Sequence, residues 1–160
     1  MLRIAPAMLQ SELSALPARL LEWHPKAEEW CIKQVLGHLI YAEEIGFAGR
    51  IRLIIASEDP QLDASAPTEA ALRRNDCERD AAELLEAFAL SRSESCALVA
   101  DLGSADLQRG GWHPAVGTMR VNDLLHEWVY HDRDHIMQIM SNIQAYTWYY
   151  LGSLQKFYQS

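Results

Sequence analysis

The last third of the sequence carries two histidines four positions apart, His131 and His135, in the segment H-D-R-D-H. On an α-helix such residues lie on one face, because each residue turns the chain by about 100° around the axis. Both imidazoles can therefore bind the same ion. Four further residues share that face: Leu124, Trp128, Gln138 and Asn142. Their largely apolar or amide character predicts that the face turns toward the interior of the protein.

A third histidine, His38, lies between Val35 and Ala42 on the apolar face of another helical segment. Three imidazoles in an apolar interior would each need a polar partner, since an unpaired buried polar group is costly. A divalent ion satisfies all three lone pairs and keeps a coordination position open, as in catalytic metal sites. The sequence therefore predicts one divalent metal ion on His38, His131 and His135. Three core histidines without a metal are the alternative.

The remaining three histidines are less suitable as metal ligands. His24 and His113 each precede a proline in an expected loop, and His126 is rotated away from the face of His131. We expect all three to be surface or structural residues. Asp132 follows His131, so the segment is not the H-E-x-x-H motif of zinc proteases, and that class is excluded.

No general base accompanies the histidines in the sequence. Glu43 and Glu127 are the nearest carboxylates along the chain, but they lie about 40° or more off the histidine faces. We expect both to be solvated at the surface. Tyr41 lies one helical turn from His38, and its hydroxyl could donate a hydrogen bond to a substrate. A structural role at the edge of the core is favoured for this residue. The sequence therefore assigns no catalytic residue.

Four segments with helical periodicity are separated by clusters of Pro, Gly, Asp and Ser. They cover approximately Ala7–Trp23, Trp30–Ser57, Asn75–Leu102, and Thr118 or Val121 to Ala145. Pro17 should kink or break the first helix, Gly103 should cap the end of the third, and Asp123 can cap the last. Strand signals are almost absent, and RGGWHPAVGT should be a turn-rich connection. The predicted fold class is all-α: one four-helix-bundle domain over residues 1–160, with a short aromatic C-terminal tail.

Charge, hydropathy and cysteine content indicate which binding partners and which cellular compartment to expect. The formal net charge of −8 and the lack of a basic stripe argue against nucleic-acid binding. No apolar run approaches the ~18 residues of a membrane span, and the N-terminal region has no uninterrupted signal-peptide core. Three widely spaced cysteines (Cys31, Cys77 and Cys96) are typical of reduced thiols rather than of a disulfide framework. These features predict a cytoplasmic protein.

The C-terminal segment YTWYYLGSLQKFYQS is rich in aromatic residues that need to be buried. They could pack on their own bundle or form a homodimer interface, where aromatic side chains are enriched. The dimer is slightly favoured.

Three blocks of the sequence resemble the DinB-like superfamily. WCIKQVLGHL, from Trp30 to Leu39, is similar to the second-helix signature of that family, which usually reads W-S-x-x-E-V-L-x-H-L. NDCERDAAELLEAF resembles the start of its third helix, and the stretch from Trp112 to Gln138 resembles its last block, where an H-P loop leads into a helix with H-x-x-x-H. Cys31 stands where the family has Ser or Thr, which weakens an N-cap, and Gln34 stands where it has Glu.

The resemblance implies a four-helix bundle with a metal on the matching residues His38, His131 and His135. Characterised members of the family include thiol-dependent S-transferases and a mycothiol-dependent isomerase, and they imply a small-molecule substrate such as a low-molecular-weight thiol. We therefore expect a metal-dependent enzyme of the S-transferase or hydrolase type, with zinc or nickel favoured as the ion and iron as a further option. A non-catalytic, metal-bound, stress-associated binding module is the alternative.

Overall fold

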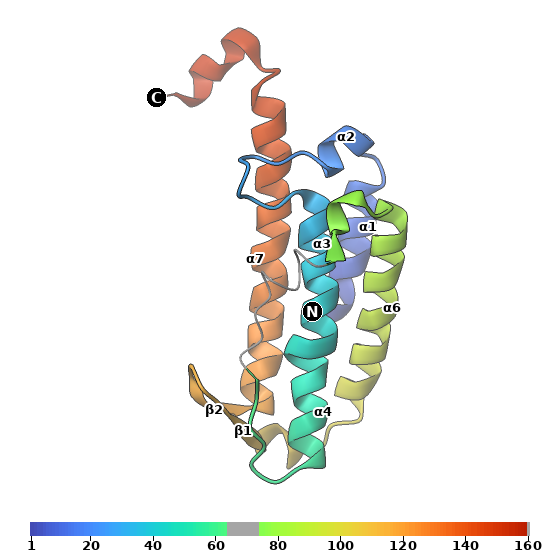
Figure 1. Ribbon diagram of the computed structural model, residues 1–160, viewed down its shortest axis with the longest axis vertical. Coiled ribbons are helices and arrows are strands. Elements are labelled where there is room, and N and C mark those ends of the chain that lie inside the picture. The colour runs from blue at the N-terminus through green and yellow to red at the C-terminus, as the bar shows by residue number, and fades with distance from the viewer. Residues whose placement is uncertain (64–73, 160) are drawn as a thin grey trace.

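The computed structural model describes residues 1–63 and 74–159, and it forms a bundle of four helical rods (Figure 1). The elements in chain order are η1 (Leu2–Ile4), α1 (Ala5–Leu13), α2 (Ala18–Leu21), α3 (Ile32–Tyr41), the π-helical segment η2 (Ala42–Phe47), α4 (Ala48–Ala56), η3 (Asp76–Glu78), α6 (Ala81–Ala100), η4 (Asp106–Gln108), β1 (Gly110–His113), β2 (Gly117–Arg120), α7 (Val121–Trp148) and η5 (Gly152–Tyr158). The predicted fold class, all-α with a short aromatic tail, is confirmed.

The first two helical rods follow the expected limits, and the first is interrupted once. The first rod is broken before Pro17: α1 ends at Leu13, and α2 begins after Pro17, which is its N-cap. The second rod runs through α3, η2 and α4 without leaving the helical state. Its start at Cys31 is capped despite the departure from the family pattern, because the Gln34 side chain accepts a hydrogen bond from the Cys31 backbone N–H at 3.0 Å.

The third rod begins later than the sequence predicted. Asp80 is its N-cap, with a side chain that accepts hydrogen bonds from the N–H groups of Ala82 and Glu83 at 2.8 and 3.1 Å. The residues after Asn75 form the short turn η3 instead of an α-helix. The prediction that Gly103 caps the C-terminus is wrong, because α6 ends at Ala100 with Asp101 in the right-handed region as its C-cap.

The fourth rod, α7, starts at Val121, and the Asp123 side chain accepts from the Arg120 N–H at 3.2 Å, as expected for a capping residue. The segment before it holds a feature that the sequence analysis missed. There β1 pairs with β2 in antiparallel register, from Gly110 opposite Arg120 to His113 opposite Gly117. Gly117 adopts a φ of +77°, which permits the tight return between the strands.

Close packing joins η3 to the second rod beside His38. A Cβ atom added to Gly37 would lie 2.0 Å from Oδ2 of the fully buried Asp76, so only glycine fits there. Arg74 and Arg79 pair with that carboxylate at 2.9 and 3.2 Å. This contact fixes η3 against the middle of α3.

The cysteines differ from the expectation of three reduced thiols. The structure joins Cys31 and Cys77 in a disulfide with a Cα–Cα distance of 6.7 Å, while Cys96 is a free thiol. The prediction is wrong for this pair because it was based on sequence spacing, which does not reveal that η3 folds back onto the start of α3.

At the C-terminus, η5 extends beyond the end of the bundle (Figure 1). Its aromatic side chains and those just before it are largely exposed: Tyr149, Tyr150, Phe157 and Tyr158. No helix in the described ranges 1–63 and 74–159 is long and apolar enough to cross a membrane.

Candidate metal centre

The three predicted ligands meet between the second and fourth rods. His38 comes from α3, and His131 and His135 come from successive turns of α7. The Nε2 atoms of His38 and His131 lie 3.0 Å apart, and one ring nitrogen from each of the three residues lies within 4.8 Å of the others. The ring centroid of His135 is 4.5 Å from that of His38 and 4.4 Å from that of His131. Three nitrogen donors therefore converge on one point.

Hydrogen bonds decide which nitrogen of His135 faces the others. Its Nδ1 lies 2.8 Å from the side-chain oxygen of Gln138, which can only accept, so Nδ1 carries the proton. The lone pair is then on Nε2. A second ring N–H donated to a neighbouring oxygen is typical of histidines that bind metals, because it fixes the tautomer and the ring orientation.

The other two rings lack such partners in the described part of the chain. Nδ1 of His38 and Nδ1 of His131 are buried without a hydrogen bond to any described residue. Without an ion, the short Nε2–Nε2 contact can hold only one proton, which leaves the rings poorly satisfied for a buried site. A divalent ion would take both Nε2 lone pairs together with that of His135, so the donor set fits a metal.

Burial keeps these imidazoles neutral, as metal binding requires. Desolvation, followed by the nearby His135 and His131, lowers the pKa of His38 to about 3. Desolvation and then His135 lower the pKa of His131 to about 4, although the carboxylate of Asp134 acts in the opposite direction. At neutral pH each of these two rings is therefore neutral and has one nitrogen lone pair that can bind a metal.

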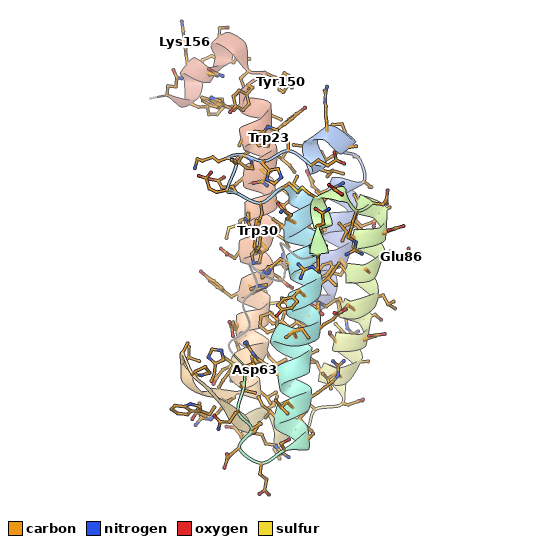
Figure 2. The ribbon with its side chains drawn as sticks, in the orientation of Figure 1. Trp23, Trp30, Asp63, Glu86, Tyr150 and Lys156 are labelled. Carbon is orange, nitrogen blue, oxygen red and sulfur yellow. A yellow bond between two sulfur atoms is a disulfide. The ribbon has the colours of Figure 1, made fainter. Side chains whose placement is uncertain are left out.

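Two aromatic side chains line the three histidines. Trp30, in the connection before α3, lies with its ring centroid 5.0 Å from His38 and 6.5 Å from His135. Figure 2 shows Trp30 and Trp23 lying along α7 from this connection. On the other side, Phe47 approaches His131 edge to face at 5.2 Å. These rings reduce the access of water to the histidines and lower the local polarity.

A buried ion network beside the histidines was not foreseen from the sequence. Arg92 of α6 is 2% exposed and donates two hydrogen bonds to Asp132 at 2.7 and 2.8 Å. It also pairs with Glu43 of η2, which in turn accepts from the indole N–H of Trp128 at 2.8 Å. Burial acts to lower the pKa of Arg92, but its hydrogen bonds to the two carboxylates raise it further, so the guanidinium is charged.

This network corrects the expectation for Glu43, which is fully buried rather than solvated. Glu43 follows the buried residues Leu36 and Leu39 by seven and four positions, so it lies on the same inward face of the helix. The sequence does carry a signal: Arg92 lies four residues after Phe88 and three before Ser95, on the apolar stripe of α6. A charged residue on such a stripe calls for a buried counter-charge.

The other residues considered from the sequence lie away from the three histidines' ring nitrogens. His126 and Glu127 are exposed, as expected. His113 is buried in the hairpin, where its Nδ1 accepts from the Ala115 N–H at 3.2 Å. Tyr41 is half-buried, with the guanidinium of Arg74 over its ring at 5.3 Å. Their positions agree with surface or structural roles.

Comparisons with known proteins identify the family of the chain and match its fold. The family model described as the DinB superfamily matches residues 1–139. The chain is 23% identical over 155 residues to a candidate metal-dependent hydrolase of Oceanobacillus iheyensis, a match that covers 89% of this chain and 82% of that protein. The fold is similar to the solved structure of YfiT from Bacillus subtilis, described as a probable metal-dependent hydrolase with an unusual four-helix bundle topology. That match has a TM-score of 0.83 and 20% identity, and it covers 92% of this chain and 84% of the other.

Proposed function

This chain belongs to the DinB superfamily, and we propose that it is a metal-dependent hydrolase of small molecules whose ion is held by His38, His131 and His135. The observation that carries the proposal is the convergence of three imidazoles, two of which have Nε2 atoms 3.0 Å apart. The two relatives named as metal-dependent hydrolases support the same reaction class. Zinc or nickel is the favoured ion and iron a further option, since imidazole nitrogen suits all three.

A divalent ion with an open position supplies Lewis-acid chemistry: it lowers the pKa of a bound water or thiol and polarises a substrate oxygen. The protein's own part is to orient the donors and exclude bulk water. Gln138 holds the ring of His135, and Trp30 covers the rings of His38 and His135. Asn142 fixes Trp30 in turn by donating to its backbone carbonyl at 2.9 Å.

A thiol-dependent S-transferase is the second candidate, and one observation favours it. No described carboxylate is hydrogen-bonded to the three histidines, and Glu43 is held by Arg92. Attack by water benefits from a general base, whereas a thiol bound to a metal loses its proton without one. A low-molecular-weight thiol as co-substrate therefore belongs to this candidate. A non-catalytic metal-bound module is the third.

The test is turnover in a panel of esters, lactones and phosphoesters with water alone, and of electrophiles with added small thiols. Metal-reconstituted protein should turn over at least one substrate, while chelator-treated protein and His131→Ala should fall to background. His126→Ala, an exposed histidine on the same helix, is the matched control and should retain full activity. Turnover only with thiol selects the transferase, and turnover that is equal with and without metal refutes a metal-dependent enzyme.

We further propose that residues 1–160 act as one domain in the cytoplasm and form a homodimer through the aromatic tail. The tail's exposed aromatics, including Tyr150, Phe157 and Tyr158, support the dimer because such side chains are enriched in interface cores. Light scattering should give twice the chain mass at micromolar concentration. Removal of residues 152–160 should yield a monomer, and a monomeric full-length chain would contradict the dimer.

A further inference from the structure

A second cluster of metal-binding side chains lies at the other end of α3 from His38. His24 belongs to the connection between α2 and α3, Cys31 is the N-cap of α3, and Cys77 lies in η3. One donor atom from each residue lies within 4.8 Å of the others. The cluster therefore brings together three segments that are up to 53 positions apart in the sequence.

The histidine of this cluster is oriented as a ligand. Nδ1 of His24 lies 2.7 Å from the backbone carbonyl oxygen of Glu29, which can only accept, so Nδ1 carries the proton. The lone pair is then on Nε2, and Nε2 lies 3.4 Å from Sγ of Cys77. An N–H donated to a backbone carbonyl from the far side of the ring is the usual support of a metal-bound histidine.

Burial and donor type indicate which ion would fit. Cys31 is fully buried, whereas His24 and Cys77 are partly exposed, so an ion and a water molecule can enter from the solvent side. Two sulfur donors and one imidazole form a softer set than the three imidazoles of the first centre, and such sets select zinc. Water would complete a four-coordinate shell.

We propose that His24, Cys31 and Cys77 form a second metal site, which takes one zinc ion when the Cys31–Cys77 disulfide is reduced. Two molecules of a small thiol reduce the bond, giving two cysteine thiols and one molecule of the small disulfide. Each cysteine thiol then releases one proton as its sulfur binds the ion, and the ion undergoes no redox change.

Zinc would preserve a cross-link that a reducing compartment removes. Disulfides are rare where small thiols keep cysteines reduced, so the link between η3 and the start of α3 would otherwise be lost there. With zinc bound, η3 stays against α3, where Asp76 meets Gly37, and the connection that carries Trp30 stays over the first centre. The role of the second site in this proposal is therefore to hold η3 against α3, with water in the position that no protein ligand fills.

Cobalt(II) is the probe for the experiment, because thiolate ligands give it a charge-transfer absorption that imidazoles alone do not give. The full-length His131→Ala protein, in which the first centre is disabled, is reduced with a trialkylphosphine and titrated with cobalt. We expect the thiolate band to saturate at one cobalt per chain and to disappear when zinc is added. The oxidised protein should show no band.

Substitutions then assign the ligands in the same background. Cys77→Ser should abolish the band, and His24→Gln should weaken cobalt binding at least tenfold, while Cys96→Ser, which removes the free thiol, should leave it unchanged. Far-UV circular dichroism of each variant checks that the helices persist. The absence of a thiolate band in the reduced parent protein, or an unchanged band in Cys77→Ser, would overturn the proposal, and neither result depends on the first centre or on activity.

Discussion

Replacing Arg92 by alanine should be among the most damaging single changes in the bundle. The side chain is 2% exposed and neutralises Glu43 and Asp132, which are 0% and 3% exposed, respectively. It also donates to the Leu2 carbonyl at 2.7 Å. Removal leaves two buried carboxylates without a cation, and breaking a buried ion pair in this way costs about 3–5 kcal/mol.

The assay is thermal unfolding of metal-free protein, followed by far-UV circular dichroism. For a chain of this size, each kcal/mol lowers the melting temperature by about 2–4 °C, so Arg92→Ala should lower it by roughly 6–20 °C. Lys26→Ala is the matched control, because the Lys26–Glu29 pair is exposed and exposed ion pairs contribute little to stability. If Arg92→Ala costs no more than Lys26→Ala, the buried network does not hold α6, η2 and α7 together.

A second variant separates lost charge pairing from lost packing. The guanidinium also lies over the rings of Phe88 and Trp128, at 4.9 and 5.6 Å. Replacing Arg92, Glu43 and Asp132 together by Met, Gln and Asn removes all three charges while keeping similar volumes. We expect this triple variant to be more stable than Arg92→Met, which keeps a similar volume but leaves both carboxylates unpaired. Equal stability would attribute the loss to packing.

Three further predictions concern the centre and its support. In protein with the Cys31–Cys77 disulfide intact, so that only the first centre takes a metal, zinc or nickel at about 100 times its dissociation constant should stabilise the wild type by about 2.7 kcal/mol in thermal unfolding. It should stabilise His126→Ala equally and leave His131→Ala unchanged; a shift in oxidised His131→Ala would contradict the ligand assignment. Burial lowers the pKa of His38 and His131 to about 3 and 4, below the 6.5 of the unfolded chain, so on acidification the unfolded state binds protons first. The free energy of unfolding of metal-free protein should therefore fall as the pH drops from about 6.5 toward 3, less steeply in His131→Ala, and an equal slope would contradict the assigned burial. Gly37→Ala should unfold at clearly lower urea concentration than Gly46→Ala, because the new Cβ meets a buried carboxylate at 2.0 Å in the first case and its nearest neighbour at 3.8 Å in the second; equal midpoints would mean that the neighbouring turn moves freely.

Much of the fold could be predicted because it depends on local periodicity. The spacing of apolar residues predicted the four rods, and Pro17 predicted the interruption of the first, since a proline in a helix interior removes a backbone hydrogen bond and clashes with the preceding turn. The limits that were wrong depend on single side chains. Asp80 starts α6, and the hairpin before α7 needs a strand pair that carries few β-forming residues.

In the candidate site too, some features follow from local sequence spacing and others depend on tertiary packing. The four-residue spacing of His131 and His135 placed both on one helical face, and the apolar neighbours of His38 placed it inward. Whether His38 reaches those two residues, 93 positions from His131, depends on how α3 packs against α7, which no local pattern specifies. The family resemblance supplied that pairing in advance, but the hydrogen bond from His135 to Gln138 and the covering ring of Trp30 needed coordinates.

The contacts that join distant segments were decided by the tertiary structure alone. Glu43 and Asp132 look like ordinary surface charges in the sequence, and only the meeting of three rods joins them with Arg92 in one buried network. Cys31 and Cys77 likewise become partners because η3 folds back onto α3. Helical faces follow from the order of residues along the chain, whereas the neighbour of each face is set by the packing of the whole bundle.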